Sequence, residues 1–195
     1  MLDYHLQQKK TGFYIDIGAH HPTHLSNSYF FYKKGWRGIN IEAMPGSIQL
    51  FNKFRPRDIN LELPIGLDGK NLTYHIFKET AYNTFDEELA HSRSTVNKCK
   101  IINTISLKTF TLAEILKDHL PAGQNIDFLS IDVEGLDLEA LKSNDWELYH
   151  PNLILVEILK HHLENIHDSN IHKYLLNKGY KLFAKTINTF FFEAI

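Results

Sequence analysis

The chain has 195 residues, of which 43% are hydrophobic and 23% charged, and its formal net charge is −2 at pH 7. This length fits one domain with a sizeable core, and the composition gives no indication of disorder. Because the net charge is near zero, we expect neither nucleic acid nor an anionic membrane as a partner. Cys99 is the single cysteine of the sequence, which excludes an internal disulfide and a cysteine metal cage.

The amino-terminal segment and the apolar runs favour a cytoplasmic protein. Residues 1–10 lack the apolar core of a signal peptide. The longest apolar stretches, such as residues 153–159, are far too short to cross a bilayer. The sequence leaves the oligomeric state open.

The first part of the chain predicts a strand, a glycine turn, a helix and a second strand. An apolar run at residues 13–17 leads into Gly18, and residues 27–34 have a helical pattern that stops at Gly35. A second apolar run follows at residues 38–42. Such a βαβ unit opens a crevice at the carboxyl ends of its strands, which suits a ligand with a ribose and a polar or anionic tail.

Strand and helix patterns continue to alternate along the chain. Further strand-like runs fall at residues 59–65, 128–133 and 153–158. Further helical patterns fall at residues 47–54, 112–119 (with Thr111 as the N-cap), 138–143 and 171–178. This alternation predicts a single α/β domain, with a doubly wound and mostly parallel sheet covered by helices on both faces.

Two further segments depart from this alternation. Leu72, Tyr74 and Ile76 alternate with more polar residues, and residues 99–107 can pair with them as an inserted hairpin. Residues 80–98 are polar and without periodicity, which predicts a loop that serves as a lid. At the end of the chain, residues 180–185 and 189–194 predict an antiparallel hairpin, as in the sheets of S-adenosylmethionine (SAM) methyltransferases.

The first candidate site residues come directly after the first predicted strand. Glycine at position 18 permits a sharp turn and the close approach of a ligand, and Asp16 can accept a hydrogen bond from an ammonium group or direct the loop. The alternative is an ordinary turn between a strand and a helix. The third glycine of a dinucleotide fingerprint is missing, which disfavours a nicotinamide cofactor.

Three acidic residues end the other central strands. Glu42 can hold both hydroxyls of a ribose, because a carboxylate offers two acceptor oxygens, or it can be a solvated strand end. Asp132 and Glu134 follow the strand at 128–133 and, by the alternation of a strand, point to the same side. One of them can act as a base while the other orients the cofactor or substrate, unless Asp132 only caps the next helix.

Glu157 and the histidines are the remaining candidates. Glu157 ends the strand at 153–158 and can contact the substrate, cap a helix or form an ion pair. His21 has an imidazole suited to a general base or a metal ligand, although surface histidines are common. Asp132, Glu157 and a histidine could form a magnesium site, but no spacing motif requires one.

The chain resembles the FkbM family of SAM-dependent methyltransferases over about residues 11–194, and several segments carry this resemblance. They are residues 13–22 (FYIDIGAHHP), 26–42 (SNSYFFYKKGWRGINIE), 83–86 (NTFD), 126–135 (IDFLSIDVEG) and 151–157 (PNLILVE). The resemblance implies a class I methyltransferase fold and transfer of a methyl group from SAM. It further implies that the acceptor atom is usually a hydroxyl oxygen of a polyketide, sugar or glycan.

The resemblance also implies roles for individual residues. Asp16 and Gly18 would lie at the methionine end of SAM, Glu42 would hold the ribose, and the loop at Asn83 and Thr84 would lie over the cofactor. The expected cofactor-binding set is Asp16, Gly18, Ala19, His20, Ser26, Asn27, Glu42, Ala43, Asn83 and Asp132, with Met44 also near the adenine. The candidate bases are Glu134, Asp132, Glu157 and His21, in that order, and we assign no metal ligands.

The expected reaction is direct displacement at the methyl carbon by a hydroxyl on a sugar, glycan or natural product. Three alternatives remain. They are an N-methyltransferase with the same cofactor residues, a nicotinamide oxidoreductase, which the missing glycine pattern disfavours, and a non-catalytic protein that binds SAM or another protein without turnover. The acidic residues at positions 16, 42, 132 and 134 argue against the third of these alternatives.

Overall fold

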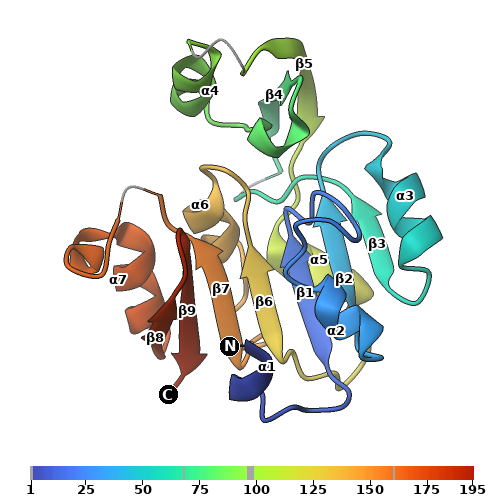
Figure 1. The fold of residues 1–195 in the computed structure, drawn as a ribbon, viewed down its shortest axis with the longest axis vertical. Helices are drawn as coiled ribbons and strands as arrows, with labels where there is room; N and C mark the ends of the chain where they lie inside the picture. Colours follow the sequence, from blue (N-terminus) through green and yellow to red (C-terminus); the bar gives the residue numbers. More distant parts are fainter. Residues whose placement is uncertain (1, 68, 96–98, 160) are drawn as a thin grey trace.

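The computed structural model describes residues 2–67, 69–95, 99–159 and 161–195. A seven-stranded sheet forms its centre, and Figure 1 shows the arrangement of the strands. The strand order is β3-β2-β1-β6-β7-β9-β8. The first five strands are parallel, and β9 pairs antiparallel with both of its neighbours, β7 and β8. The strands are β1 (Phe13–Ile17), β2 (Arg37–Glu42), β3 (Ile59–Glu62), β6 (Phe128–Ile131), β7 (Leu153–Glu157), β8 (Tyr180–Lys185) and β9 (Thr189–Ala194). The predicted doubly wound sheet with a terminal hairpin is confirmed.

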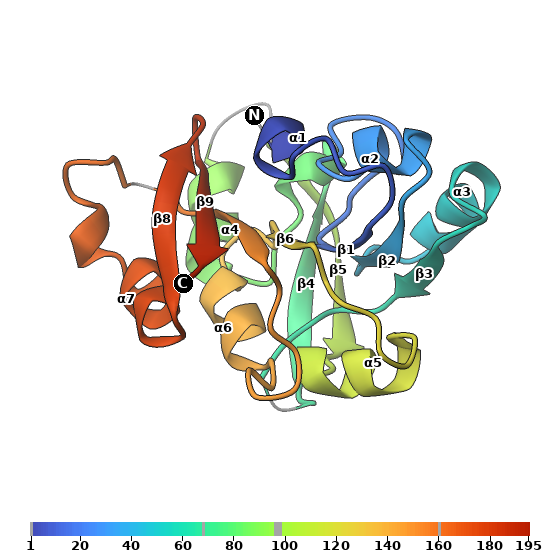
Figure 2. The same cartoon turned by 90° about the horizontal axis from the view of Figure 1, so that it is seen from below.

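Helices cover both faces of the sheet (Figure 2). On one face lie α5 (Leu112–His119), α6 (Asp137–Lys142) and α7 (Asn170–Asn177), and on the other lie α1 (Leu2–His5) and α2 (Tyr29–Lys33). Alternation along β1 explains this division. Ile15 and Ile17 face the α5–α7 layer, whereas Tyr14 packs with Phe31 and Trp36 on the α2 side.

Most predicted helix and strand positions agree with the structure to within a few residues. The helix α3 (Ser47–Phe54), like α5, has the predicted bounds, and Thr111 caps α5 in a reciprocal box with Glu114. The predicted strands at 59–65 and 128–133 are too long, because β3 stops at Glu62 and β6 stops at Ile131.

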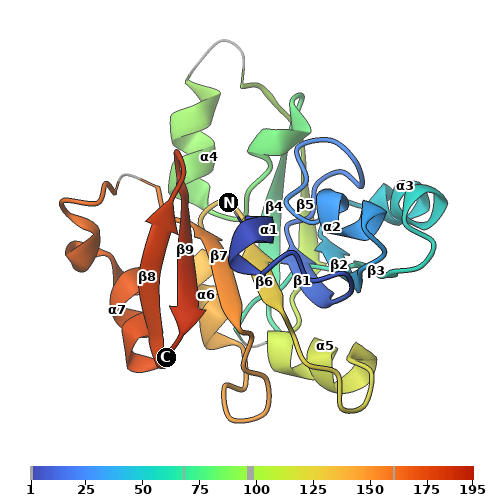
Figure 3. The same cartoon turned by 60° about the horizontal axis from the view of Figure 1, so that its bottom comes forward.

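An insertion between β3 and α5 stands beyond the carboxyl ends of the parallel strands (Figures 1 and 3). As predicted, β4 (Asn71–Phe77) and β5 (Ile101–Lys108) form a separate antiparallel pair. The expected loop at 80–98 is wrong in part, since it contains a 3₁₀ turn, η1 (Thr80–Tyr82), and a helix, α4 (Glu87–Ser94). Residues 96–98 lie outside the described residues.

The helix α4 forms without the apolar periodicity that usually reveals a helix. The Asp86 carboxylate accepts a hydrogen bond from the Leu89 amide at 2.8 Å and so caps the amino end. Acidic residues occupy its first turn and basic residues its last, which complements the helix dipole. Only Ala90 is buried among its residues, so capping and the dipole interactions stabilise this helix in place of a buried apolar face.

Over the part of the chain that the structure describes, no helix has the length and apolar character needed to span a bilayer.

Candidate functional site

A pocket lies where the carboxyl ends of β1, β2 and β6 meet the insertion. Its lining includes every residue of the expected cofactor-binding set, together with Glu134. Those residues are Asp16, Gly18, Ala19, His20, Ser26, Asn27, Glu42, Ala43, Asn83 and Asp132. The insertion adds Tyr74, Thr80, Ala81 and Phe85, which sequence reasoning did not assign to the site.

Gly18 brings two loops of the pocket into direct backbone contact. Its φ is +74°, and a β-carbon at this position would collide with the backbone carbonyl oxygen of Asp132. The backbone is also tied to the neighbouring strand, because the Gly18 and Ala19 amides both donate to the Ile41 carbonyl oxygen. Only glycine therefore fits where the loop after β1 touches the loop after β6.

Three residues without glycine's freedom adopt left-handed backbone conformations in the pocket lining. His20, Leu25 and Glu134 each have φ of 51°. Such conformations are unfavourable for most side chains and persist where the surrounding structure holds them. Because all three residues line the pocket, the surrounding fold holds the backbone of the pocket loops in these unfavourable conformations.

Glu42 closes one side of the pocket and fixes the loops around it. One carboxylate oxygen accepts from the His20 amide at 2.7 Å, and the other accepts from the Met44 amide at 2.9 Å. Burial raises the pKa of Glu42, while these two hydrogen bonds oppose the rise. Since each carboxylate oxygen can accept a second hydrogen bond, two hydroxyl groups of a ligand can still bind here.

Asp16 lines the pocket with only 4% of its surface exposed. It accepts a hydrogen bond from the Ser28 hydroxyl. Burial raises the pKa of Asp16, and the Ser28 hydrogen bond followed by the charge of Arg55 opposes the rise. Beside it, the Asn27 amide donates to the Ser130 hydroxyl at 3.1 Å.

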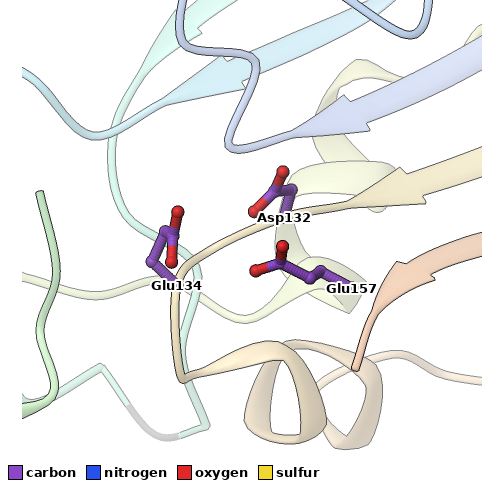
Figure 4. A group of neighbouring side chains, drawn as sticks. All are labelled: Asp132, Glu134 and Glu157. Carbon is purple, nitrogen blue, oxygen red and sulfur yellow. The ribbon is translucent and has the colours of Figure 1, made fainter. Parts of the chain in front are cut away.

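A cluster of three carboxylates lies at the carboxyl ends of β6 and β7 (Figure 4). Two of them, Asp132 and Glu134, line the pocket, whereas the predicted residue Glu157 is not among the lining residues. Oxygen atoms of Asp132, Glu134 and Glu157 all lie within 4.8 Å of one another, and Figure 4 shows Asp132 and Glu157 turned toward each other. Three such groups can share a proton or a divalent cation. Among the described residues, Asp132 and Glu157 are grouped with Glu134, and no histidine belongs to this cluster.

Burial and then the charges of neighbouring carboxylates raise the pKa of two members of the cluster, Asp132 and Glu157. Asp132 lines the pocket. Desolvation raises its pKa to about 8, and the charges of Glu157 and Glu134 add to the rise. Burial and then the Glu134 charge raise the pKa of Glu157. One Glu157 oxygen accepts from Asn188 at 3.4 Å, and the other is buried without a hydrogen-bond partner in the described structure.

Glu134 reaches the cluster through a turn. Asp132 and Glu134 do lie close together, as predicted. Strand alternation is not the reason, because β6 ends before both residues. Glu134 has a left-handed backbone conformation, and its carboxylate accepts a hydrogen bond from the Arg93 guanidinium of α4. Its carbonyl oxygen accepts from the Thr84 hydroxyl at 2.6 Å, so the insertion holds this turn at two points.

Asp137 and Arg93 are site residues that sequence reasoning missed. The Asp137 carboxylate accepts from the Val133 amide at 3.0 Å and from the Gly135 amide at 3.2 Å, which fixes the turn that carries Glu134. Burial raises the pKa of Asp137 to about 7, against these hydrogen bonds. Its place at the start of a helix was a signal for Asp137, whereas no sequence pattern pointed to Arg93.

His21 is not among the pocket-lining residues, unlike the other predicted residues of the first loop. Its Nδ1 accepts from the Thr23 amide at 3.2 Å and from the His24 amide at 3.0 Å. Desolvation and the neighbouring histidines lower the pKa of His21. The ring therefore holds its own loop, and the structure does not bring it together with the carboxylate cluster.

The strand order, the terminal antiparallel hairpin and a pocket across the carboxyl ends of three central strands define a Rossmann-like methyltransferase fold. A family model described as the Methyltransferase FkbM domain matches residues 16–182. Because this match covers most of the chain, the protein belongs to that family and is a methyltransferase. Membership implies that SAM is the methyl donor. A comparison with curated proteins gave no match.

Proposed function

We propose that the protein transfers the methyl group of SAM to a hydroxyl oxygen of a sugar, glycan or natural product in the cytoplasm. The observation that carries this proposal is the division of the pocket between two acidic ends. Glu42 keeps free acceptor capacity at one end, and the carboxylate cluster stands at the other. These ends suit a ribose and a group that loses a proton, respectively.

Pocket-lining residues suit each part of the cofactor. Asp16 would accept from the ammonium group, and Ser26 and Asn27 would contact the carboxylate. Glu42 would hold the ribose hydroxyls. Ala43 and Asn83, with Met44 beside them, would border the adenine, and the Asn83 amide already donates to the Met44 sulfur at 3.6 Å.

Bound SAM supplies a methyl group activated by a sulfonium, so the protein needs to align the acceptor and remove one proton. Alignment of reactants in a pocket can lower a barrier by roughly 7–11 kcal/mol in well-oriented cases. We assign proton removal to Asp132, ahead of Glu134, because a carboxylate with a raised pKa is the stronger base. The Glu134 carboxylate already forms an ion pair with Arg93.

Calorimetry with SAM and S-adenosylhomocysteine (SAH) tests the cofactor assignment. We expect both to bind and NAD to give no heat. Glu42→Gln should weaken SAH binding roughly 10- to 100-fold, because hydrogen bonds to a charged group contribute about 1.5–3 kcal/mol. Glu88→Gln, a change of an exposed acid on α4, is the matched control. Absence of SAM and SAH binding by the wild type would refute the proposal.

A screen with radiolabelled SAM tests the acceptor. Hydroxyl acceptors should be labelled, and matched amine analogues should not. Labelling of the amines alone would favour the N-methyltransferase. Tight SAM binding without labelling of any acceptor would favour a non-catalytic role.

A further inference from the structure

Arg55 is a fully buried cation behind the pocket wall, and it follows α3 directly. It lies against α2, with its guanidinium carbon 5.3 Å from the ring centre of Tyr29 and 5.4 Å from that of Tyr32. Asp58 balances the charge, since one of its oxygens lies 3.6 Å from Arg55 Nη1. A buried arginine is costly unless its donors are satisfied, so the use of these donors is informative.

The guanidinium donors reach the loop that carries two pocket residues. Nε donates to the Pro22 carbonyl oxygen at 2.6 Å, and Nη2 donates to the Ser26 hydroxyl at 2.7 Å. Nη1 donates to the Ser28 hydroxyl at 3.0 Å. Arg55 therefore holds the loop after β1 at three positions, of which Ser26 lines the pocket.

The chemistry of arginine fixes the direction of the hydrogen bonds beyond it. A guanidinium can only donate, so the Ser28 oxygen must accept from Arg55 and give its own proton to Asp16. This arrangement favours the ionised form of Asp16, which then accepts from a ligand.

The same reasoning applies to the second serine. The Ser26 oxygen accepts from Arg55 and also from the Tyr29 amide at 3.2 Å, which uses both of its lone pairs. Its proton can then go to the Ser28 oxygen at 3.3 Å or to a ligand in the pocket. Ser26 thus faces the pocket as a donor, beside Asp16 as an acceptor.

We infer that Arg55 is a positioning residue that sets the hydrogen-bond directions at the amino acid end of the cofactor pocket. Through Ser28 it keeps Asp16 an acceptor for an ammonium group, and it leaves Ser26 a donor for a carboxylate. This inference rests on the proposed function and assigns to its pocket a selectivity for the zwitterionic tail of the cofactor.

The test compares two ligands that differ only in that tail. SAH carries the ammonium and the carboxylate, whereas 5′-methylthioadenosine keeps the adenosine and the sulfur without them. Arg55→Lys retains the charge but cannot reproduce the fork of donors. By calorimetry we expect SAH to bind this variant about tenfold or more weakly, and methylthioadenosine to bind within about twofold of the wild type.

Arg57→Lys is the matched control, because Arg57 is exposed and donates to the Tyr32 carbonyl oxygen away from the pocket. It should leave both affinities unchanged. Equal weakening of SAH and methylthioadenosine by Arg55→Lys would show a general structural role and overturn the inference, as would unchanged SAH binding. If the wild type binds neither ligand, the proposed function itself has failed.

A second variant keeps the test decisive if Arg55→Lys does not fold. Ser28→Ala preserves Arg55 and removes the link to Asp16. We expect its SAH affinity to decline at a higher pH than that of the wild type as the solution is acidified, because Asp16 then protonates more readily. An unchanged pH profile of SAH binding in this variant would contradict the inference.

Discussion

Arg93 on α4 donates to the carboxylate of Glu134, which joins the insertion to the turn after β6 by an ion pair. Both side chains are largely shielded from solvent, with 15% and 22% of their surface exposed. Arg93 also donates to the Tyr82 carbonyl oxygen at 2.9 Å, so it braces α4 against η1. Arg93 therefore links the insertion to the carboxylate cluster.

Arg93→Gln should loosen the lid. Loss of a hydrogen bond between charged groups costs about 1.5–3 kcal/mol, which corresponds to roughly a 10- to 150-fold change in the closing equilibrium. We expect faster chymotrypsin cleavage after Tyr82 and Phe85, and a higher KM for the acceptor. His91→Gln, at an exposed position of the same helix, should behave like the wild type. Unchanged cleavage in Arg93→Gln would show that the ion pair does not hold the lid.

The pH dependence of methyl transfer should report Asp132. A base must be deprotonated, and its pKa is raised to about 8, so kcat/KM should rise with pH and level off above pH 8. Glu157→Gln removes the largest neighbouring charge that raises this pKa, and should move the rising limb to lower pH. Glu164→Gln, an exposed change, should not. A limb at the same pH in Glu157→Gln would remove Asp132 from the role of base.

The contribution of Asp132 to the stability of the fold should also depend on pH, but it should decrease as the pH rises, whereas the activity should increase. The ordinary pKa of 3.8 applies in the unfolded chain, so between about pH 4 and pH 8 the folded state binds the proton more tightly. Its contribution is thus most favourable at low pH and is lost as the pH rises through 8. Asp132→Asn should raise Tm at pH 8.5 more than at pH 5, and the exposed Asp118→Asn should raise it at neither. An equal effect at both values would exclude the raised pKa.

Gly18→Ala and Gly123→Ala separate the cost of a left-handed backbone from the cost of a close contact. The two glycines have φ of +74° and +72°, but a β-carbon at Gly123 meets nothing within 4 Å. Gly123→Ala should therefore cost about 1–2 kcal/mol. Gly18→Ala should cost about 2–5 kcal/mol, because the collision with Asp132 adds strain. Urea unfolding measures both, and equal costs would contradict the proposed contact.

The pocket residues at the strand ends were accessible from sequence because their signal is local. Asp16, Gly18, Glu42 and Asp132 each follow an apolar run, and parallel strands bring such ends to one edge of the sheet. The prediction of strand length was poorer, since Val133 continues an apolar run but lies in the pocket lining beyond β6. Periodicity does not distinguish an apolar wall of a site from the core of a sheet.

The two arginines that support the site, Arg55 and Arg93, could not be predicted from the sequence, because their environment depends on residues far away in the chain. Arg55 ends a helix pattern and looks like a surface residue, yet the partners that bury it include Ser26 and Tyr14, far away in the sequence. Arg93 lies in a segment without periodicity, and its helix depends on capping by Asp86. The burial of a charged residue together with its partners depends on the tertiary structure, and local sequence patterns do not show it.

The insertion leaves the domain and returns to it at adjacent points. The Gly66 amide donates to the Phe110 carbonyl oxygen and the Thr109 amide to the Lys70 carbonyl oxygen, both at 2.9 Å. An insertion of different sequence can therefore join the domain at the same two points without changing the path of the chain there. Such an exchange would have to keep Asn83, Thr84 and Arg93, because Asn83 lines the pocket and the other two hold the turn that carries Glu134.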